Sequence, residues 1–430
     1  AIVWSQNVVA VKTEEQVGLA NSVDYLKKMG ITTVRESGTY NDINLSALAL
    51  GGMTEGISPL EMAAAYGSLG NSGIYVKPRT FTKITDNSGN IIYENDPWKE
   101  FVVDEKTAFL MTDMLHEAVT AGTGARAKFE SSNSKMPVAG KTGTTTDNYD
   151  AWFVGYTPYY SASVWIGNDL QVELDSGSRS SAILWQSFMS KIHEGYPDTS
   201  FEKPQGIVTV AVDTKSGKLP TELSYLDTRN TVRNEYFAEG TEPVEYDDVH
   251  VQMTVCADSG LIPTGYCPIT SLENRVFVKR AVPYIPSEHL DKDEYALVPR
   301  DWIYEIPQKY CNVHGYGYLY QYNMDNLPDE AIQMPDGTVQ LPGNVLLMLD
   351  GSFMLPNGQI IPPQPSVNEY IESNPNLINS PDPTTGQLLP PQGFMPPEPP
   401  VEIVPVAEED TSVDDEDIGE SEETESEETE

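Results

Sequence analysis

Two short segments of the chain carry residue types that suit chemistry at a carbonyl group. Lys141-Thr142-Gly143-Thr144 places a cation beside two hydroxyls, and Ser5-Gln6-Asn7 places a hydroxyl two residues from an amide. Hydroxyls beside a cation can bind a carboxylate, while a backbone N–H polarises a carbonyl. Because Gly143 has no side chain, another backbone or a ligand can approach the chain closely there. The two segments are therefore the first candidates for a substrate site.

Each segment also has a purely structural explanation. Lys141 can be a surface lysine beside a glycine bulge, and Ser5 can cap the apolar, helix-compatible run that follows it. A match as short as Lys-Thr-Gly carries little weight alone. The elements around the two segments have to decide between these interpretations.

Three segments with helical signals surround the candidate residues. Residues 58–73 begin with a capping box formed by Ser58 and Glu61. Residues 104–124 start with Asp104 as a candidate cap. Residues 104–124 and 183–195 have apolar residues at helical spacing. All three segments are therefore predicted to be amphipathic helices.

Strand signals lie between the second and third of these helices. Residues 136–144, 150–157 and 161–168 are short, apolar or alternating, and separated by turn residues. We interpret them as consecutive antiparallel strands. Helices that flank an antiparallel sheet predict an α+β fold.

Three longer stretches give these elements a family context. They are GGMTEGISPLEMAAAYGSLGNSGIYVKP (51–78), TAFLMTDMLHEAVTAGTGARA (107–127) and AGKTGTTTDNYDAWFVGYTP (139–158), and they resemble the transpeptidase domain of class A, bifunctional penicillin-binding proteins. The order of Ser-Gln-Asn and Lys-Thr-Gly-Thr agrees with two motifs of that family. The resemblance covers roughly residues 1–195. It implies the penicillin-binding and β-lactamase-like transpeptidase fold, incomplete at its N-terminus.

The resemblance implies a serine D,D-transpeptidase that cross-links peptidoglycan through an acyl-enzyme. The partners it implies are stem peptides, with a D-Ala-D-Ala donor and an amine acceptor, and β-lactam antibiotics. No cofactor and no catalytic metal are expected. Two alternatives stay open: a D,D-carboxypeptidase or β-lactamase with water as acceptor, and a non-catalytic module that binds the cell wall.

The resemblance also implies a role for each motif residue. Ser5 would relay a proton to the leaving amine, and Asn7 would hold the donor's amide and help to orient a lysine. Lys141 would supply positive potential and a hydrogen bond towards Ser5. In the segment Thr142-Gly143-Thr144, the two hydroxyls would bind the donor's terminal carboxylate. Gly143 would let the substrate lie along the strand, and the N–H of Thr144 would form half of the oxyanion hole.

The nucleophilic serine of this family lies in an S-x-x-K motif that precedes the S-x-N motif. Two matches occur downstream instead, at Ser132–Lys135 and Ser200–Lys203. About one such match is expected by chance at ordinary residue usage, so we interpret both as chance. We therefore expect a fragment without the nucleophile, the glycosyltransferase domain and the membrane anchor that usually precede these motifs. The expected location is the extracytoplasmic face of the cell membrane, held there by the missing anchor.

The charge of the chain bears on its partners. The formal net charge is -39, and residues 401–430 contain 15 acidic residues without a single Lys or Arg. Binding to nucleic acid needs a basic footprint, so this class of partner is excluded. No apolar run in the sequence reaches the roughly 18 residues that span a bilayer.

An internal repeat follows the first 200 residues. Residues 210–224 parallel 254–267, and residues 245–250 parallel 309–314. The alignment pairs Asp213 with Cys256, Ser224 with Cys267, Asp247 with Cys311, and His250 with His314.

The second copy of this repeat holds all three cysteines of the chain. Cys256, Cys267, Cys311 and His314 could form a Cys3His zinc site. Outside the cell a Cys256–Cys267 disulfide is the favoured interpretation. Unpaired thiols are the third possibility. Because the first copy lacks cysteines, the repeat is expected to be structural.

The composition divides the chain into three predicted parts. Residues 1–200 are the C-terminal part of the transpeptidase domain, 201–315 a β-rich appendage, and 316–430 a Pro-rich and acidic tail. Small hairpins are expected at 335–345 and 349–359, and the tail is otherwise expected to be largely disordered.

Overall fold

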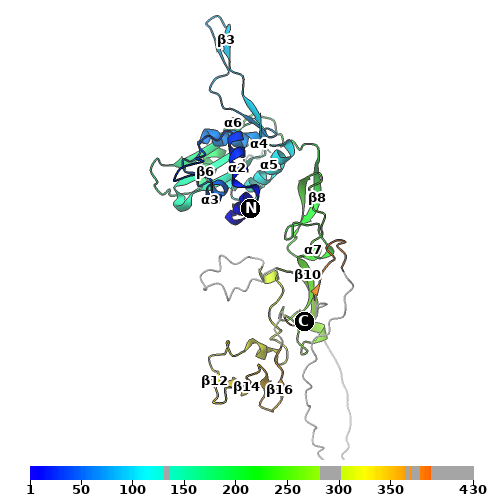
Figure 1. Ribbon diagram of the computed structural model, residues 1–430. Helices are drawn as coiled ribbons and strands as arrows, with labels where there is room; N and C mark the ends of the chain where they lie inside the picture. Colours follow the sequence, from blue (N-terminus) through cyan, green and yellow to red (C-terminus); the bar gives the residue numbers. More distant parts are fainter. Residues whose placement is uncertain (130–135, 281–301, 365–368, 370–377, 389–430) are drawn as a thin grey trace, which may run out of the picture. The chain divides into compact units, whose positions relative to one another are not determined.

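The computed structural model describes residues 1–129, 136–280, 302–364, 369 and 378–388 (Figure 1). Contacts within the chain divide it into two compact units. Unit 1 comprises Ala1–Leu219 with Val232–Val244, and unit 2 comprises Pro220–Thr231 with Glu245–Glu430. Within the described ranges, every helix is too short or too polar to span a bilayer.

A three-stranded antiparallel sheet forms the centre of unit 1. Its strands are β5 (Ala139–Thr144), β6 (Asp150–Tyr156) and β7 (Ser161–Gly167), and their order in space is their order in the sequence. These strands lie within the predicted segments. Because helices flank the sheet, the predicted α+β fold is confirmed.

The helices that pack on this sheet begin at identifiable caps. Ser58 and Glu61 form the predicted capping box, in which each side chain bonds the backbone N–H of the other residue. Asp104 accepts hydrogen bonds from two N–H groups of its helix, as predicted. The third helix begins at Arg179 and not at residue 183. The prediction missed its first turn because that turn is polar and lacks apolar periodicity. These helices are α4 (Pro59–Gly70), α5 (Glu105–Thr120) and α6 (Arg179–Ile192).

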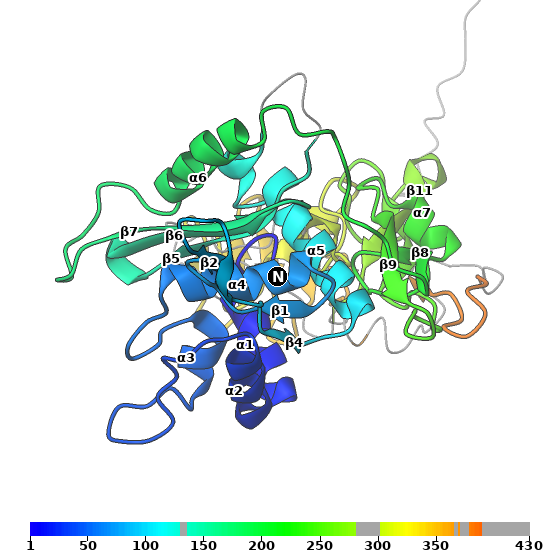
Figure 2. The ribbon, with the colours of Figure 1, turned by 90° about the horizontal axis from the view of Figure 1, so that it is seen from above.

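Helices cover both faces of the sheet because alternate residues of a strand point to opposite sides. Phe153 of β6 is fully buried against Trp185 of α6, with ring centroids 5.2 Å apart. Tyr156 of the same strand faces α5, where its hydroxyl bonds that of Thr112 at 2.8 Å. Figure 2 shows α6 on one side of the strands and α4 on the other.

Shorter elements complete unit 1. The chain starts with helices α1 to α3. Two antiparallel strand pairs, β1 with β4 and β2 with β3, lie between α4 and α5 in the sequence. A further hairpin, β8 with β9, ends the unit. The elements are α1 (Asn7–Val17), α2 (Leu19–Lys28), α3 (Leu45–Leu50), β1 (Ile74–Val76), β2 (Lys83–Thr85), β3 (Ile91–Glu94), β4 (Lys99–Phe101), η1 (Ala125–Ala127), η2 (Thr146–Asn148), β8 (Ile207–Asp213) and β9 (Val232–Ala238).

Unit 2 is built on a second antiparallel sheet with the strand order β11-β10-β17. Its core consists of buried apolar side chains that include Val251, Met253 and Ile262. The elements are α7 (Glu222–Leu226), β10 (His250–Cys256), η3 (Ile269–Ser271), β11 (Leu272–Val278), η5 (Trp302–Tyr304) and β17 (Ile378–Asn379).

Residues 317–361 form a small folded region within unit 2. Five short strands make one antiparallel sheet, and Leu319 and Phe353 are among the side chains of its core. These residues were predicted to lie in a tail, although small hairpins were expected there. Order extends beyond the hairpins because successive hairpins share one apolar face. The elements are η6 (Gly317–Gln321), β12 (Ile332–Gln333), β13 (Val339–Leu341), β14 (Val345–Leu347), β15 (Phe353–Met354) and β16 (Ile360–Ile361).

The turns after β8 and β10 close with the same hydrogen bonds. The N–H of Gly217 donates to Asp213 O at 2.8 Å, and the N–H of Gly260 donates to Cys256 O at 2.7 Å. Both glycines have φ in the left-handed region, +72° and +71°. The positions that the sequence analysis aligned therefore occupy equivalent places in two similar turns.

Candidate active site

The two candidate segments meet in unit 1. The Lys141 Nζ of β5 donates a hydrogen bond to the Ser5 Oγ across 136 positions of sequence. It also donates to the backbone oxygen of Thr142 at 2.9 Å. Ser5 is exposed, whereas Lys141 is half-buried. A cation and a hydroxyl are thus held together at a place that solutes can reach.

The backbone at Ser5 adopts an unusual conformation. Its φ is +53°, in the left-handed region that residues other than glycine rarely occupy. Gln6, not Ser5, is the N-cap of α1, so the interpretation of Ser5 as a helix cap is wrong. Such strain persists only where surrounding structure fixes it, and it occurs often at functional sites. Here it turns the hydroxyl towards Lys141.

A loop that follows α5 holds the start of the chain against β5. The Thr123 N–H donates to Val3 O at 3.1 Å, and the Thr123 hydroxyl bonds that of Thr142 at 2.8 Å. A Cβ at Gly122 would lie 2.2 Å from Val3 O, so only glycine fits there. Thr123 was not among the residues predicted from the sequence. The glycines on both sides of it, in TAGTG, are the signal that marked this close approach.

The end of β5 is open at Thr144. Thr144 is exposed, and its hydroxyl accepts a hydrogen bond from the Ser178 N–H at 3.4 Å. Gly143 pairs across the sheet with Trp152, and a Cβ at Gly143 would lie 3.3 Å from the Trp152 Cβ. Strand β5 lies at an edge of the sheet, so the backbone of this segment has one side without a strand partner in the described residues.

The remaining predicted residues are not joined to this pair. Asn7 is the first residue of α1 and is exposed, and no hydrogen bond links it to Lys141 in the described part of the chain. Ser132–Lys135 lies outside the described residues. Lys203 stacks on the ring of Tyr236, with its Nζ 5.3 Å from the centroid.

Burial changes the acid–base properties of Lys141. It lowers the pKa of the Lys141 ammonium, because removal from water disfavours the charged form. A lysine with a lowered pKa releases its proton more easily to a hydrogen-bonded partner. The partner present here is the Ser5 hydroxyl.

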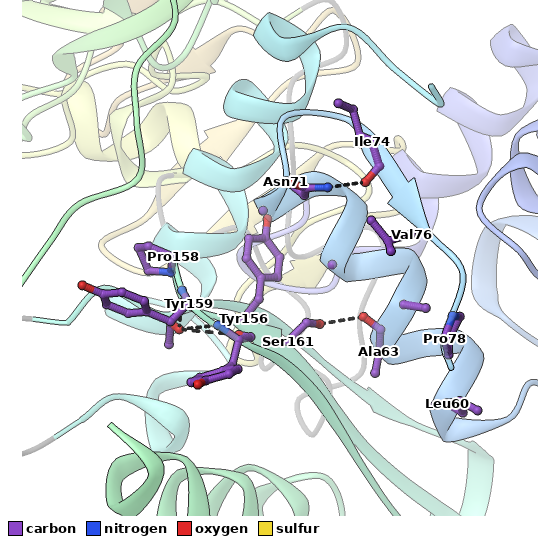
Figure 3. A pocket seen from close by; sticks show the side chains of 15 residues that line it. Leu60, Ala63, Asn71, Ile74, Val76, Pro78, Tyr156, Pro158, Tyr159 and Ser161 are labelled. Atoms are coloured by element: carbon purple, nitrogen blue, oxygen red, sulfur yellow. Dashed lines mark hydrogen bonds between the residues drawn. The ribbon is translucent and has the colours of Figure 1, made fainter. Parts of the chain in front are cut away.

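A pocket of unit 1 lies apart from these residues. It has a volume of about 460 Å³ and lies between α4, β1 and the turn that joins β6 to β7. Figure 3 shows Ser161 bonded to Ala63 O across it, at 2.6 Å. Neither Ser5 nor the Lys141–Thr144 segment lines this pocket. Its lining includes the side chains of Asn71, Tyr159 and Ser161.

The cysteines lie in unit 2, away from these residues in the sequence. Cys256, Cys267 and Cys311 are all buried and free. The predicted Cys256–Cys267 disulfide is therefore wrong for this structure.

Comparisons with known proteins match this chain to penicillin-binding proteins. The family model described as penicillin binding protein transpeptidase domain matches residues 1–189, and the model for the C-terminal domain of penicillin-binding protein 1A matches residues 203–252. Penicillin-binding protein 1A of Clostridium botulinum (strain Langeland) is 40% identical over 300 residues, which are 69% of this chain and 35% of that protein. Penicillin-binding protein 2D of Bacillus subtilis is 33% identical over 249 residues, or 56% of this chain and 34% of that protein.

The chain therefore spans about a third of the length of these curated relatives. Among solved structures, penicillin-binding protein 1A from Haemophilus influenzae is similar to 56% of this chain over 40% of its own. The sequence identity is 24% and the TM-score is 0.47.

Proposed function

Because this chain belongs to the class A penicillin-binding proteins, we propose that residues 1–189 form part of a peptidoglycan D,D-transpeptidase site. The observation that carries the proposal is the hydrogen bond from Lys141 to Ser5, since it joins the two family motifs that this chain contains. The substrates are stem peptides that end in D-Ala-D-Ala and an acceptor amine. β-Lactams bind at the same place.

The reaction has two covalent steps. A serine of the S-x-x-K motif attacks the carbonyl of the penultimate D-Ala and forms an ester, while the nitrogen of the terminal D-Ala takes up the serine proton and leaves as an amine. An acceptor amine then attacks the ester, forms the cross-link and returns the proton to the serine oxygen. Ser5 and Lys141 form the path by which a proton reaches the leaving amine. The lowered pKa of Lys141 favours this transfer.

The edge strand β5 binds the donor. An extended peptide can add to a free strand edge through backbone hydrogen bonds. The exposed Thr144 and the hydroxyl of Thr142 then bind the terminal carboxylate, and the N–H of Thr144 contributes to the oxyanion hole. Asn7 reaches the donor's amide only after substrate binds, since it has no partner among the described residues of the site.

The other functions on this scaffold differ in the fate of the acyl-enzyme. A β-lactamase would turn penicillin over, and a D,D-carboxypeptidase would release the shortened peptide without a cross-link. The family model that matches residues 1–189 is described as a transpeptidase domain, which favours transpeptidation. Because peptidoglycan lies outside the cell, we place the reaction at the extracytoplasmic face of the cell membrane.

Labelling with a fluorescent penicillin tests the proposal. Two proteins are treated in parallel: the full product of the reading frame that contains this chain, and the 430-residue chain alone. The labelled peptides are then mapped. We expect a stable label on an S-x-x-K serine that precedes Ser5, and none on the 430-residue chain. A stable label on Ser5, Ser132 or Ser200 would contradict the assignment of the nucleophile.

A lysine variant tests the role of the Lys141–Ser5 hydrogen bond directly. Lys141→Ala in the full reading frame is expected to slow acylation by on the order of 10²-fold, because it removes a proton-transfer group. Lys83→Ala, at an exposed lysine of β2, is the matched control and leaves the rate unchanged. Equal acylation rates for both variants would remove Lys141 from the mechanism.

A further inference from the structure

Four side chains with metal-binding atoms converge inside unit 2. The Sγ atoms of Cys256, Cys267 and Cys311 and a ring nitrogen of His314 all lie within 4.8 Å of one another. The three cysteines are buried, and His314 is half-buried. We propose that these four residues bind a structural Zn²⁺ ion. This site is separate from the transpeptidase chemistry and does not rest on it.

The spacing of the ligand atoms fits tetrahedral coordination. Zn–S bonds of about 2.3 Å and Zn–N bonds of about 2.0 Å give tetrahedral edges of about 3.8 Å between two sulfurs and about 3.5 Å between sulfur and nitrogen. The Sγ atoms of Cys256 and Cys311 are 3.6 Å apart. The Nδ1 of His314 lies 3.4 Å and 3.5 Å from these two sulfurs. Three ligand atoms therefore already outline one face of a zinc tetrahedron.

The groups around the cluster orient its ligands. The Nε2 of His314 lies 3.2 Å from the Asp258 carboxylate, which leaves Nδ1 directed at the sulfurs. Zinc-binding histidines almost always donate their second N–H to such a group. The Val313 N–H donates to the Cys311 Sγ at 3.4 Å, and the Thr264 N–H donates to the Cys267 Sγ at 3.4 Å. These donors stabilise thiolates, which are the form that binds the metal.

The loops that carry the ligands are tightly built. A Cβ at Gly317 would lie 2.1 Å from Cys311 O, and a Cβ at Gly315 would lie 2.4 Å from the Tyr266 ring. Gly315 and Gly260 also have positive φ, +57° and +71°. The chain is therefore shaped to fold closely around these residues. A loose group of buried thiols would not need such loops.

A disulfide explains the cluster less well. All three cysteines are free, and the Cys256 and Cys311 sulfurs lie 3.6 Å apart, whereas an S–S bond is about 2.0 Å long. Any single disulfide would also leave one buried cysteine without a partner and His314 without a function. A tetrahedral ion uses all four residues, which matches the C-x-x-H spacing of Cys311 and His314.

Metal analysis of the full chain tests the proposal. The protein is purified without chelators, and zinc, iron, nickel and copper are quantified per chain by mass spectrometry. We expect one zinc per chain, together with three thiols that react with a thiol reagent only after chelation. Stoichiometric iron in place of zinc, or a protein without metal and with fewer than three titratable thiols, would overturn the proposal.

Variants separate metal binding from general instability. Cys267→Ser is expected to abolish stoichiometric zinc. Asp258→Asn changes only a half-exposed carboxylate and is expected to weaken zinc affinity by about 10-fold to 100-fold in a competition with a chromophoric chelator. Asp325→Asn, at an exposed carboxylate of the same unit, is the matched control. Unchanged affinity in both Cys267→Ser and Asp258→Asn would exclude the site.

Discussion

The two copies of the repeat stabilise their buried residues in different ways. In the first copy the Ser224 hydroxyl donates to the Asp247 carboxylate at 3.0 Å, and the His250 Nδ1 lies 2.9 Å from the same carboxylate. The other ring nitrogen of His250 lies 2.9 Å from Asp227. In the second copy, the positions aligned with Ser224 and Asp247 hold Cys267 and Cys311, and three sulfurs surround a histidine nitrogen.

The difference shows how two similar loops can be stabilised by different interactions: hydrogen bonds between side chains in the first copy and the proposed ion in the second. In the first copy, oxygen-bearing side chains and a histidine bond one another directly. Thiols are weak hydrogen-bonding groups, and three of them around a histidine have little to gain from one another. The second copy therefore depends on an ion, and the four predictions below test that contrast.

Metal removal has the largest expected effect. Structural zinc contributes about 10 kcal/mol of binding free energy, so a strong chelator is expected to unfold the loops of the second copy. Hydrogen exchange followed by mass spectrometry measures the change. Peptides from 256–271 and 309–317 are expected to lose protection, whereas peptides from 222–227 keep it. Equal loss in both copies would mean that the ion does not act locally.

Asp247→Ala tests the first copy by removing its central acceptor. The variant leaves the buried Ser224 hydroxyl and the His250 Nδ1 without that acceptor, which costs about 3 kcal/mol. Urea unfolding measures the loss, and Asp329→Ala at an exposed carboxylate is the control. The zinc content stays at one per chain. A variant that lost zinc would show that the two copies are coupled.

The pH dependence of stability gives a smaller effect in the first copy. Burial opposes ionisation of Asp227, but hydrogen bonds from Arg229 and His250 lower its pKa from 3.8 to about 2. A lowered pKa in the folded state stabilises the protein above pH 4, and this contribution is lost as the pH falls from about 4 to about 2. The loss amounts to about 2 kcal/mol.

The measurement compares the unfolding free energy of the wild type and of Asp227→Asn over that pH range. The wild type is expected to lose about 2 kcal/mol more than the variant. Parallel pH profiles for the two proteins would contradict the assignment of this carboxylate.

The smallest effect concerns the turns that the two copies share. Gly217→Ala and Gly260→Ala each force an L-residue into the left-handed region at a cost of about 1 kcal/mol. An added Cβ meets no atom within 4 Å at Gly217 and only the Arg275 Nη1, at 3.4 Å, at Gly260. The two variants should therefore match in urea unfolding. A clear difference would mean that the turns are not equivalent.

Local signals in the sequence predicted much of unit 1. The caps at Ser58 and Asp104 depend on residues within one helical turn, so they can be recognised without tertiary information. The start of α6 was missed because its polar first turn carries no apolar periodicity. Trp185 of that helix is buried by a strand distant in the sequence, which no local pattern expresses.

The candidate site was predictable only in part. The motifs identified Ser5 and Lys141, but the left-handed backbone of Ser5 depends on how the first residues pack. Thr123 was missed because its contact with Thr142 arises from a loop that meets the chain start. The spacing of the cysteines allowed a disulfide or an ion, and only the structure shows that all three cysteines are free and converge with His314.

The backbone conformation of Ser5 has a consequence for engineering of this domain. Glycine at position 5 would relieve the left-handed strain, worth about 1 kcal/mol, and would remove the hydroxyl that Lys141 contacts. A screen that rewards thermal stability alone would therefore enrich glycine at position 5. Libraries meant to keep the proposed proton path therefore need serine at that position.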